Sequence, residues 1–327
     1  MGPSPIAFLF FLLLGFLGAA LGDNNQTHVP PNVPPKAEDK PAEKRVVTPE
    51  LRFNLEAGLY EHLPPIWGYW KGWASGWIPK PCREAAVQKH LNPWEMEVYS
   101  VKYDDCDEPW TICRHFSDTS SIAMMVETLG KIPLGMREYA STIVTVPNLG
   151  GAAGLSFSEM DIPVIDVRYD CFREELLAHE ISHILDSHAL KKYTNGSDFS
   201  TSSWWKGNYS LDDAAVSKYA LTMWQENFAE AADPALYDMV VPGGLSDITA
   251  DAKSVSHVIS TYKNVLGDII KPQSKPKCTK RWANHEVVPV DDRKVPPYPA
   301  PDVRIKVKGI EQIENLGKKK TKCVRPH

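Results

Sequence analysis

Two histidines and a glutamate stand together in one short stretch, His179-Glu180-Ile181-Ser182-His183, with the spacing of an HExxH motif. Residues four apart on an α-helix share one face, roughly 6 Å apart along the axis, so both imidazoles can bind one Zn²⁺. Glu180 projects beside them, where it can accept a proton from a water that the metal activates. These residue types at this spacing predict the zinc centre of a hydrolase.

A catalytic zinc site of this kind needs a third protein ligand. A metzincin would carry a histidine where this chain has Ala189, and a deuterolysin-like enzyme an aspartate where it has Thr194. The remaining option is a glutamate from a second helix. Glu226 and Glu230 lie four residues apart within Leu211–Asp233 and therefore share a helix face. A metal ligand followed by an acceptor for a ligating histidine would give both carboxylates a role.

The elements that must position these side chains can be read from the same region. Segment 161–170, DIPVIDVRYD, is rich in β-branched residues and predicts a strand, and 171–190 has apolar residues at helical spacing. Segment 141–148, STIVTVPN, predicts a further strand at a sheet edge. Segment 211–233 predicts a helix capped by Ser210 or Asp212. We therefore expect an α+β fold, with a mixed sheet packed on the HExxH helix and a more helical second subdomain.

HEISH followed by ENFAEAAD resembles the gluzincins, and most of all the anthrax-lethal-factor-like metallopeptidases, over about residues 160–235. Their downstream helix carries the pattern E-x-F-A-E-A, whose first glutamate binds zinc. The resemblance implies a zincin-like fold in which His179, His183 and Glu226 hold Zn²⁺. It also implies that Tyr219, seven residues before Glu226, assists catalysis. As a whole, the chain resembles secreted fungal proteins described as conidiation-specific, a phrase that names an expression pattern and not a chemistry.

The expected function is that of a zinc metallopeptidase acting on a protein or peptide substrate, and each candidate residue has an expected role. Glu180 is the expected general base, Tyr219 the expected donor to the oxyanion, and Glu230 the residue that orients an imidazole. Two alternatives stay open. One is a secreted non-enzymatic protein with a structural zinc site. The other is a cell-wall glycan-binding protein that uses the tryptophans of the segment Trp67–Trp77.

Composition and the chain ends predict an exported, monomeric protein. The 327 residues are 43% hydrophobic and 24% charged with a net charge of −5, which fits a globular chain and excludes a polybasic nucleic-acid binder. Residues 1–22 resemble a signal peptide, so no membrane contact is expected after its removal. Residues 23–45 predict a Pro-rich linker or a pro-segment ending in Lys44-Arg45. Residues 46–275 would form the catalytic domain, and 276–327 a basic, disulfide-tied tail.

Six cysteines in an exported chain predict three disulfides, with 15 possible pairings. Cys106 and Cys113 are close enough in sequence for a local bond, and Cys278 and Cys323 could tie down the tail. Cys171 could anchor the start of the HExxH helix. Three N-glycosylation sequons predict a glycoprotein and begin at Asn25, Asn195 and Asn208.

Overall fold

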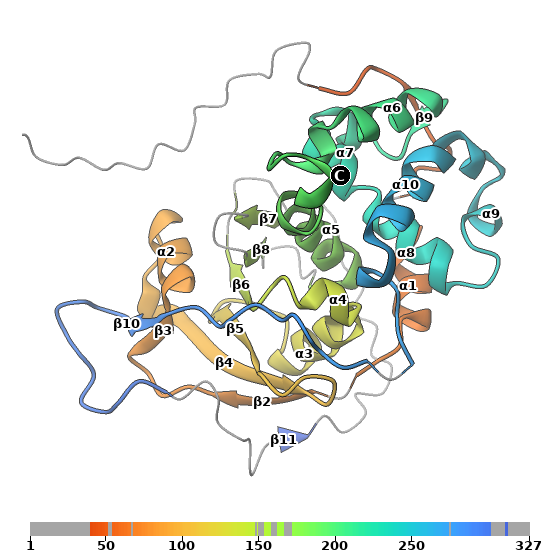
Figure 1. The fold of residues 1–327 in the computed structure, drawn as a ribbon. Helices are drawn as coiled ribbons and strands as arrows, with labels where there is room; N and C mark the ends of the chain where they lie inside the picture. Colours follow the sequence, from red (N-terminus) through yellow and green to blue (C-terminus); the bar gives the residue numbers. More distant parts are fainter. Residues whose placement is uncertain are drawn as a thin grey trace, which may run out of the picture. The chain divides into compact units, whose positions relative to one another are not determined.

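The structure is a computed structural model, drawn as a ribbon in Figure 1. The chain divides into two units, Met1–Pro35 and Lys36–His327, and every residue described belongs to the second. The described residues are 40–51, 54–66, 68–147, 149, 154–157, 162–166, 172–274, 276–301 and 311–312. The predicted signal peptide, Asn25, Trp67, Cys171 and Cys323 lie outside these ranges.

A seven-stranded mixed sheet forms the framework. Its strands lie in the order β11–β2–β4–β5–β6–β8–β7. β5, β6 and β8 run parallel to one another, whereas β7 and the strands on the other side pair antiparallel with their neighbours. The strands are β2 (Gly68–Gly72), β4 (Met96–Tyr103), β5 (Trp110–His115), β6 (Thr142–Val146), β7 (Gly154–Phe157), β8 (Ile162–Asp166) and β11 (Glu311–Gln312). This mixed sheet confirms the α+β class.

Segment 141–148 is a strand, but its predicted edge position is wrong. β6 pairs with β5 on one side and with β8 on the other. Its side chains alternate between two cores, since Ile143 joins one cluster of buried residues whereas Val144 and Val146 join the other. A strand that is apolar on both faces is typical of the buried, parallel part of a sheet.

Helices cover both faces of this sheet. α3, α4, α5, α1, α8 and α10 build the larger core, and α2 covers the smaller one on the other face (Figure 1). The helices are α1 (Glu56–His62), α2 (Lys80–Gln88), α3 (Ile122–Lys131), α4 (Leu134–Arg137), α5 (Glu174–Ile184), α6 (Ser203–Leu211), α7 (Trp224–Ala229), α8 (Ala232–Val240), α9 (Leu245–Ile248) and α10 (Ser256–Leu266). The HExxH helix α5 packs on β7 and β8, as expected.

The single helix expected over 211–233 is wrong. The chain instead passes from α6 through a short strand, β9 (Ala214–Ala215), and a 3₁₀ turn (Tyr219–Leu221) to α7 and α8. Asp212 does not cap this segment. Its carboxylate accepts hydrogen bonds from the backbone N–H groups of His257 (2.8 Å) and Val258 (2.9 Å), at the start of α10. Asp212 therefore caps the N-terminus of α10 and not that of a helix over 211–233.

Two disulfides lie within the described residues, Cys82–Cys113 and Cys106–Cys278. The predicted local bond between Cys106 and Cys113 is therefore wrong, whereas Cys278 does tie down the chain that follows α10, as expected. Cys113 on β5 is bonded to Cys82 on α2, because the side chains of both residues lie in the smaller core. Cys106 lies in the turn after β4, and its bond fastens the chain that follows α10.

Both chain ends of the described unit pack on the fold. At the N-terminal end, β1 (Arg45–Val46) pairs in parallel with β9. At the C-terminal end, β10 (Val287–Pro289) pairs antiparallel with β3 (Trp77–Pro79). Between Cys278 and β10, the Arg281 guanidinium lies 4.7 Å from the centre of a Trp110 ring.

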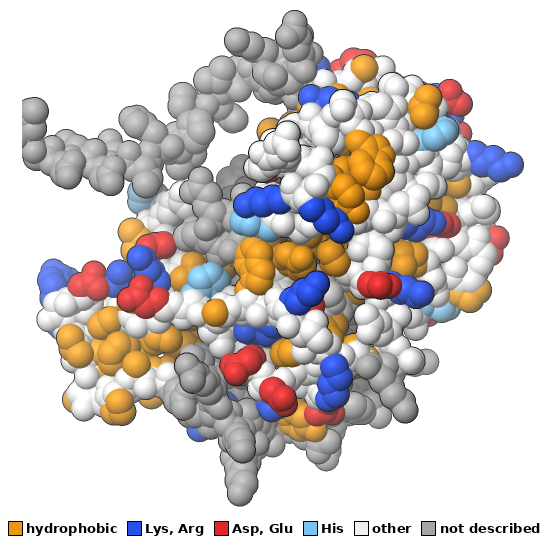
Figure 2. All heavy atoms as spheres, viewed as in Figure 1, with side chains coloured by type: hydrophobic (Ala, Val, Ile, Leu, Met, Phe, Trp, Pro, Cys, Tyr) orange, Lys and Arg blue, Asp and Glu red, His pale blue; other side chains and the backbone are white. Residues whose placement is uncertain are grey.

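No helix among the described residues is long and apolar enough to cross a bilayer. On the face shown in Figure 2, lysine and arginine side chains are interspersed with aspartate and glutamate, and apolar side chains form separate patches. This mixture of charges suits the small net charge of the chain.

Candidate metal centre

His179 and His183 project from consecutive turns of α5. The helix buries Leu177, Ala178, Ile181 and Ile184 against the core, which leaves the two histidines together on the other side. Their ring centroids are 5.0 Å apart with an angle of 82° between the planes. The helix spacing of the motif therefore produces the convergence that the sequence predicted.

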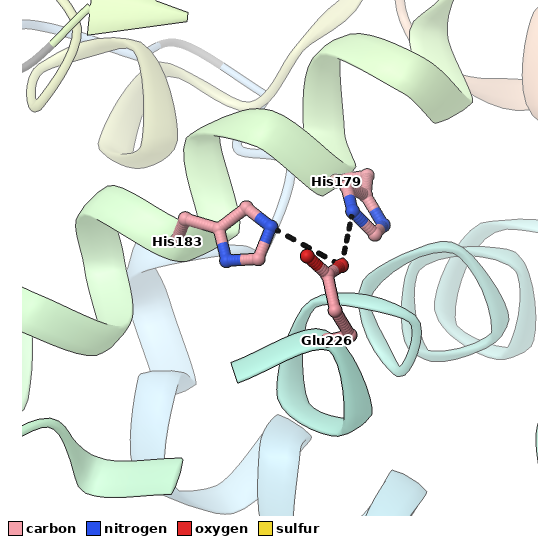
Figure 3. A group of neighbouring side chains, drawn as sticks. All are labelled: His179, His183 and Glu226. Carbon is pink, nitrogen blue, oxygen red and sulfur yellow. Dashed lines mark hydrogen bonds and ion pairs between the residues drawn. The ribbon is translucent and has the colours of Figure 1, made fainter. Parts of the chain in front are cut away.

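Glu226, in the first turn of α7, brings a carboxylate between these two rings (Figure 3). Its Oε2 atom lies 3.1 Å from Nε2 of His179 and 3.4 Å from Nε2 of His183. Candidate ligand atoms of the three residues all lie within 4.8 Å of one another. Within the described residues, this is the one group of three or more histidine, cysteine or acidic side chains close enough to hold a metal ion.

The spacing of the donor atoms fits a zinc ion. Tetrahedral zinc with bonds of about 2.0–2.1 Å requires its ligand atoms to lie about 3.3–3.4 Å apart. The two contacts to Glu226 Oε2 lie close to this value. Two imidazoles and one carboxylate also match the donor set of catalytic zinc sites that keep one position for water.

Glu230 supports His179 from the other side of its ring. Its Oε1 atom lies 3.3 Å from Nδ1 of His179, whereas Glu226 faces Nε2 of the same ring. Glu230 is 5% exposed and stands one turn after Glu226, at the end of α7. The carboxylate therefore favours the tautomer that leaves Nε2 available to a metal.

Tyr219 lies beside the same histidine. Its ring centroid is 6.2 Å from that of His179, and the two planes are inclined by 29°. Tyr219 is 40% exposed and reaches the site from the 3₁₀ turn before α7, not from a shared helix face with Glu226. Asn227 ties this turn to α6, since its Nδ2 donates to the Ala220 carbonyl (3.0 Å) and its Oδ1 accepts from Nε1 of Trp205 (2.9 Å).

Glu180 is buried where α5 meets the edge strand β7. It is 4% exposed, and its carboxylate lies against the Cα of Gly154. A Cβ atom at position 154 would stand 2.4 Å from Oε1 of Glu180. Glycine at this position therefore leaves the space that the carboxylate occupies, a constraint that the sequence-based interpretation missed. The glycine-rich run 150–154 was the one signal of it.

The surroundings of the site shift the pKa values of Glu226 and Tyr219. Burial raises the pKa of Glu226, but its hydrogen bonds and electrostatic interactions with His179 and His183 outweigh burial and hold that pKa well below its usual range. Burial, the charge of Glu226 and a hydrogen bond to it raise the pKa of Tyr219 well above its usual range. Tyr219 therefore keeps its hydroxyl proton at neutral pH and can serve as a donor.

Further residues hold the HExxH helix in place, and the motif gave no indication of them. Ser182, inside the motif, lies 2.6 Å from the hydroxyl of Tyr262 on α10. The helix continues after Ile184 as a π-helix (Leu185–Ala189), in which Asp186 accepts from the Ser200 N–H at 2.7 Å. Burial raises the pKa of Asp186 to about 7. A π-helix next to a site is often a functional feature.

The structure thus brings together all six residues singled out in the sequence, on α5, the 3₁₀ turn and α7. The described tryptophans of the segment 67–77, which are Trp70, Trp73 and Trp77, do not join them. Trp70 packs against the larger core, Nε1 of Trp73 donates to Ser100 Oγ (2.8 Å), and Nε1 of Trp77 donates to the Tyr298 carbonyl (3.1 Å).

The fold and this donor set define a mixed α/β protein with a candidate His₂Glu metal centre at the edge of its sheet. The chain belongs to the family described as conidiation-specific protein Con-13, which matches residues 54–319. It is 27% identical over 222 residues to conidiation-specific protein 13 of Neurospora crassa, a match that covers 66% of this chain. The matched part spans 62% of that relative's length. The resemblance to conidiation-specific proteins is therefore confirmed.

Proposed function

We propose that this protein is a secreted, monomeric zinc metallopeptidase of the gluzincin type, with a zincin-like fold. One observation carries the proposal: His179, His183 and Glu226 present donor atoms at zinc spacing, Tyr219 lies beside His179, and Glu180 is close enough for its charge to act on Tyr219. A structural zinc site would need neither a buried carboxylate at the metal nor a tyrosine hydroxyl directed to it. Catalysis of amide hydrolysis needs both roles.

His179, His183 and Glu226 would hold the zinc, which would supply a Lewis acid that polarises the scissile carbonyl and activates water. Glu180 would accept the water proton as the oxygen attacks the carbonyl carbon. It would pass that proton to the amine nitrogen as the C–N bond breaks. Tyr219 would donate a hydrogen bond to the carbonyl oxygen as negative charge develops there. Glu230 would hold the His179 ring through Nδ1.

The edge strand β7 supports a peptide as the substrate. In the described part of the chain, β7 pairs with β8 alone and stands last in the sheet order. Its outer edge can add an extended peptide by main-chain hydrogen bonds, a common way to bind an unfolded segment. Gly154, which contacts Glu180, belongs to this strand. A peptide on β7 would therefore pass next to the general base.

Two experiments test the proposal. The natively secreted protein is analysed for metal by mass spectrometry, and its hydrolysis of a peptide library is followed beside two variants. We expect one zinc per chain, lost in Glu226→Ala. Glu180→Gln should keep the zinc and lose hydrolysis by at least about 10²-fold.

The alternatives give different results. Zinc in the wild type with no hydrolysis of any peptide would favour a structural zinc site. A folded wild type that takes up no zinc, even when zinc is supplied, would contradict the metal centre itself. Binding to insoluble cell-wall glycan that chelation does not change would favour the glycan-binding alternative.

A further inference from the structure

A tight, exposed turn carries one of the three sequons. The backbone N–H of Ser197 donates to the Thr194 carbonyl (3.2 Å), and Gly196 has a φ of +97°, a conformation that glycine adopts without strain. Asn195, Gly196 and Ser197 are all exposed. A Cβ atom built on Gly196 would meet nothing within 4 Å. The turn therefore has open space for a large group on Asn195.

The turn is fixed to the fold on both sides. Thr194 is buried (8% exposed), and its hydroxyl donates to the Ser197 carbonyl. Directly after the turn, Asp198 accepts from Ser187 Oγ (3.0 Å) and from Gln225 Nε2 on α7 (3.3 Å). A group attached to Asn195 would therefore leave the surface from a defined position rather than from a loose loop.

Two aromatic rings stand exposed next to this turn. Tyr193, two residues before Asn195, is 39% exposed, and Trp204 on α6 is 48% exposed. Their ring centroids are 5.3 Å apart and the planes meet at 85°. Both rings also pack edge-to-face against the fully buried Phe199. The pair therefore offers a rigid apolar surface beside the sequon.

The second described sequon, at Asn208, lies in a different setting. Asn208 is inside α6 and only partly exposed, and its Nδ2 donates to the Trp204 carbonyl (3.0 Å). The middle residue of this sequon, Tyr209, is 2% exposed. The folded chain accommodates a bulky group at Asn195 far more readily than at Asn208.

We propose that Asn195 carries an N-linked glycan and that its first sugar packs on the Tyr193–Trp204 ring pair. The donor would be a lipid-diphosphate oligosaccharide. The Nδ2 atom of Asn195 forms a bond to C1 of the first sugar, the C1–O bond to the diphosphate breaks, and the amide gives up one proton. The C–H face of a pyranose can then cover exposed aromatic surface that water otherwise contacts.

This inference requires export, which the proposed function includes, but it does not require zinc or hydrolysis. Its test uses the full chain secreted from a yeast host, with glycopeptides mapped by mass spectrometry. We expect Asn195 to be occupied. Asn195→Gln and Ser197→Ala should each remove that glycan, and the matched control Asn208→Gln should keep it. A secreted wild type with unmodified Asn195 would overturn the proposal, whether or not the protein binds zinc.

The packing on the ring pair has its own readout. Loss of the glycan through Ser197→Ala should lower the Tm by about 2 °C in a chain with intact Tyr193. The same substitution should change the Tm far less in a Tyr193→Ser background, because one of the two aromatic rings on which the sugar packs is then absent. Trp204→Ser provides a second background with the same expectation. Equal losses of Tm in all three backgrounds would show that the sugar does not use the rings.

Discussion

Glu230 places Oε1 3.3 Å from Nδ1 of His179, at the nitrogen opposite the one that faces Glu226. Two glutamates one helical turn apart, Glu226 and Glu230, therefore contact the two ring nitrogens of His179. Such a carboxylate fixes the ring and increases the basicity of the nitrogen that binds the metal.

Replacement of Glu230 by Gln tests this relationship. The variant removes the negative charge at Nδ1 and leaves all three proposed ligands in place. We expect zinc affinity to fall by about 10–100-fold, measured by competition with a chromogenic chelator. The exposed Glu61 supplies a matched control, since Glu61→Gln changes the same charge away from the site. Equal affinities for wild type and Glu230→Gln would exclude a supporting role.

Removal of the metal should destabilise the folded protein. Zinc held by His179, His183 and Glu226 would bind only the folded state, because three separate positions must converge. At a free zinc concentration 100 times the Kd, this linkage contributes about 2.7 kcal/mol. A chelator should therefore lower the Tm of the wild type, and added zinc should restore it. Glu226→Ala should show neither change, and a chelator response in that variant would place the metal elsewhere.

Substitution of Gly154 by Ala should impair hydrolysis without removing zinc. The new Cβ would lie 2.4 Å from Oε1 of Glu180, so the carboxylate must move. We expect a lower kcat with zinc content unchanged, because no proposed ligand touches the new methyl group. Gly207→Ala is the matched control, since a Cβ there meets nothing within 4 Å and lies inside α6. Full activity in Gly154→Ala would show that Glu180 does not act from its observed position.

Helix geometry predicts the histidine–histidine and glutamate–glutamate pairs of the candidate metal centre, whereas the roles of Glu226 and Tyr219 follow from the exclusion of other zinc-site patterns and from the resemblance to the gluzincins. An i, i+4 spacing fixes the two histidines on one face and the two glutamates on another. Strand 161–170 and the HExxH helix could be predicted from β-branched content and helical periodicity for the same local reason. The structure places β8 and α5 there.

The connection between these helices could not be predicted from local pattern. The carboxylate of Asp212 accepts a hydrogen bond from the backbone N–H of His257 in α10, 45 residues further on. The side chain of Asn227 donates to the Ala220 carbonyl and so fixes the 3₁₀ turn outside a continuous helix. The disulfides have the same cause, since Cys106 and Cys278 are 172 residues apart. The contact of Gly154 with Glu180 joins a strand and a helix across the fold. Each of these features depends on tertiary packing, which overrides local propensity.

The Lys44-Arg45 pair should resist dibasic-specific proteases in the folded protein. The ammonium group of Lys44 donates to the carbonyls of Tyr209 and Asp212, and Arg45 pairs with both oxygens of Asp251 (2.5 and 2.8 Å). The bond after Arg45 also lies within strand β1. We expect a kexin-like protease to leave the native protein intact at this bond and to cut it after denaturation. N-terminal sequencing checks the products, and rapid cleavage of the native protein at Arg45 would contradict this structural role.

Asp118 should make the stability of the protein fall as the pH rises. This carboxyl is 5% exposed in the turn between β5 and α3, where its Oδ1 accepts from the Ser120 N–H at 2.8 Å. Burial raises its pKa above the ordinary value of 3.8, although hydrogen bonds from Ser120 and Thr145 and the charge of Arg114 oppose the shift. The folded state therefore holds this proton more tightly than the unfolded state does. The stabilisation is complete below about pH 4 and is lost as the pH rises through the raised pKa of the folded state.

Asp118→Asn cannot ionise and retains an oxygen that can accept from Ser120. Its free energy of unfolding, relative to that of the wild type, should therefore increase as the pH rises from about 4. Urea unfolding of both proteins at a series of pH values, with chelator present throughout, measures this difference. The shared titrations of all other groups cancel in the comparison. A difference that stays constant across the series would mean that the pKa of Asp118 is the same in the folded and unfolded states, so that Arg114 and the hydrogen bonds fully offset its burial.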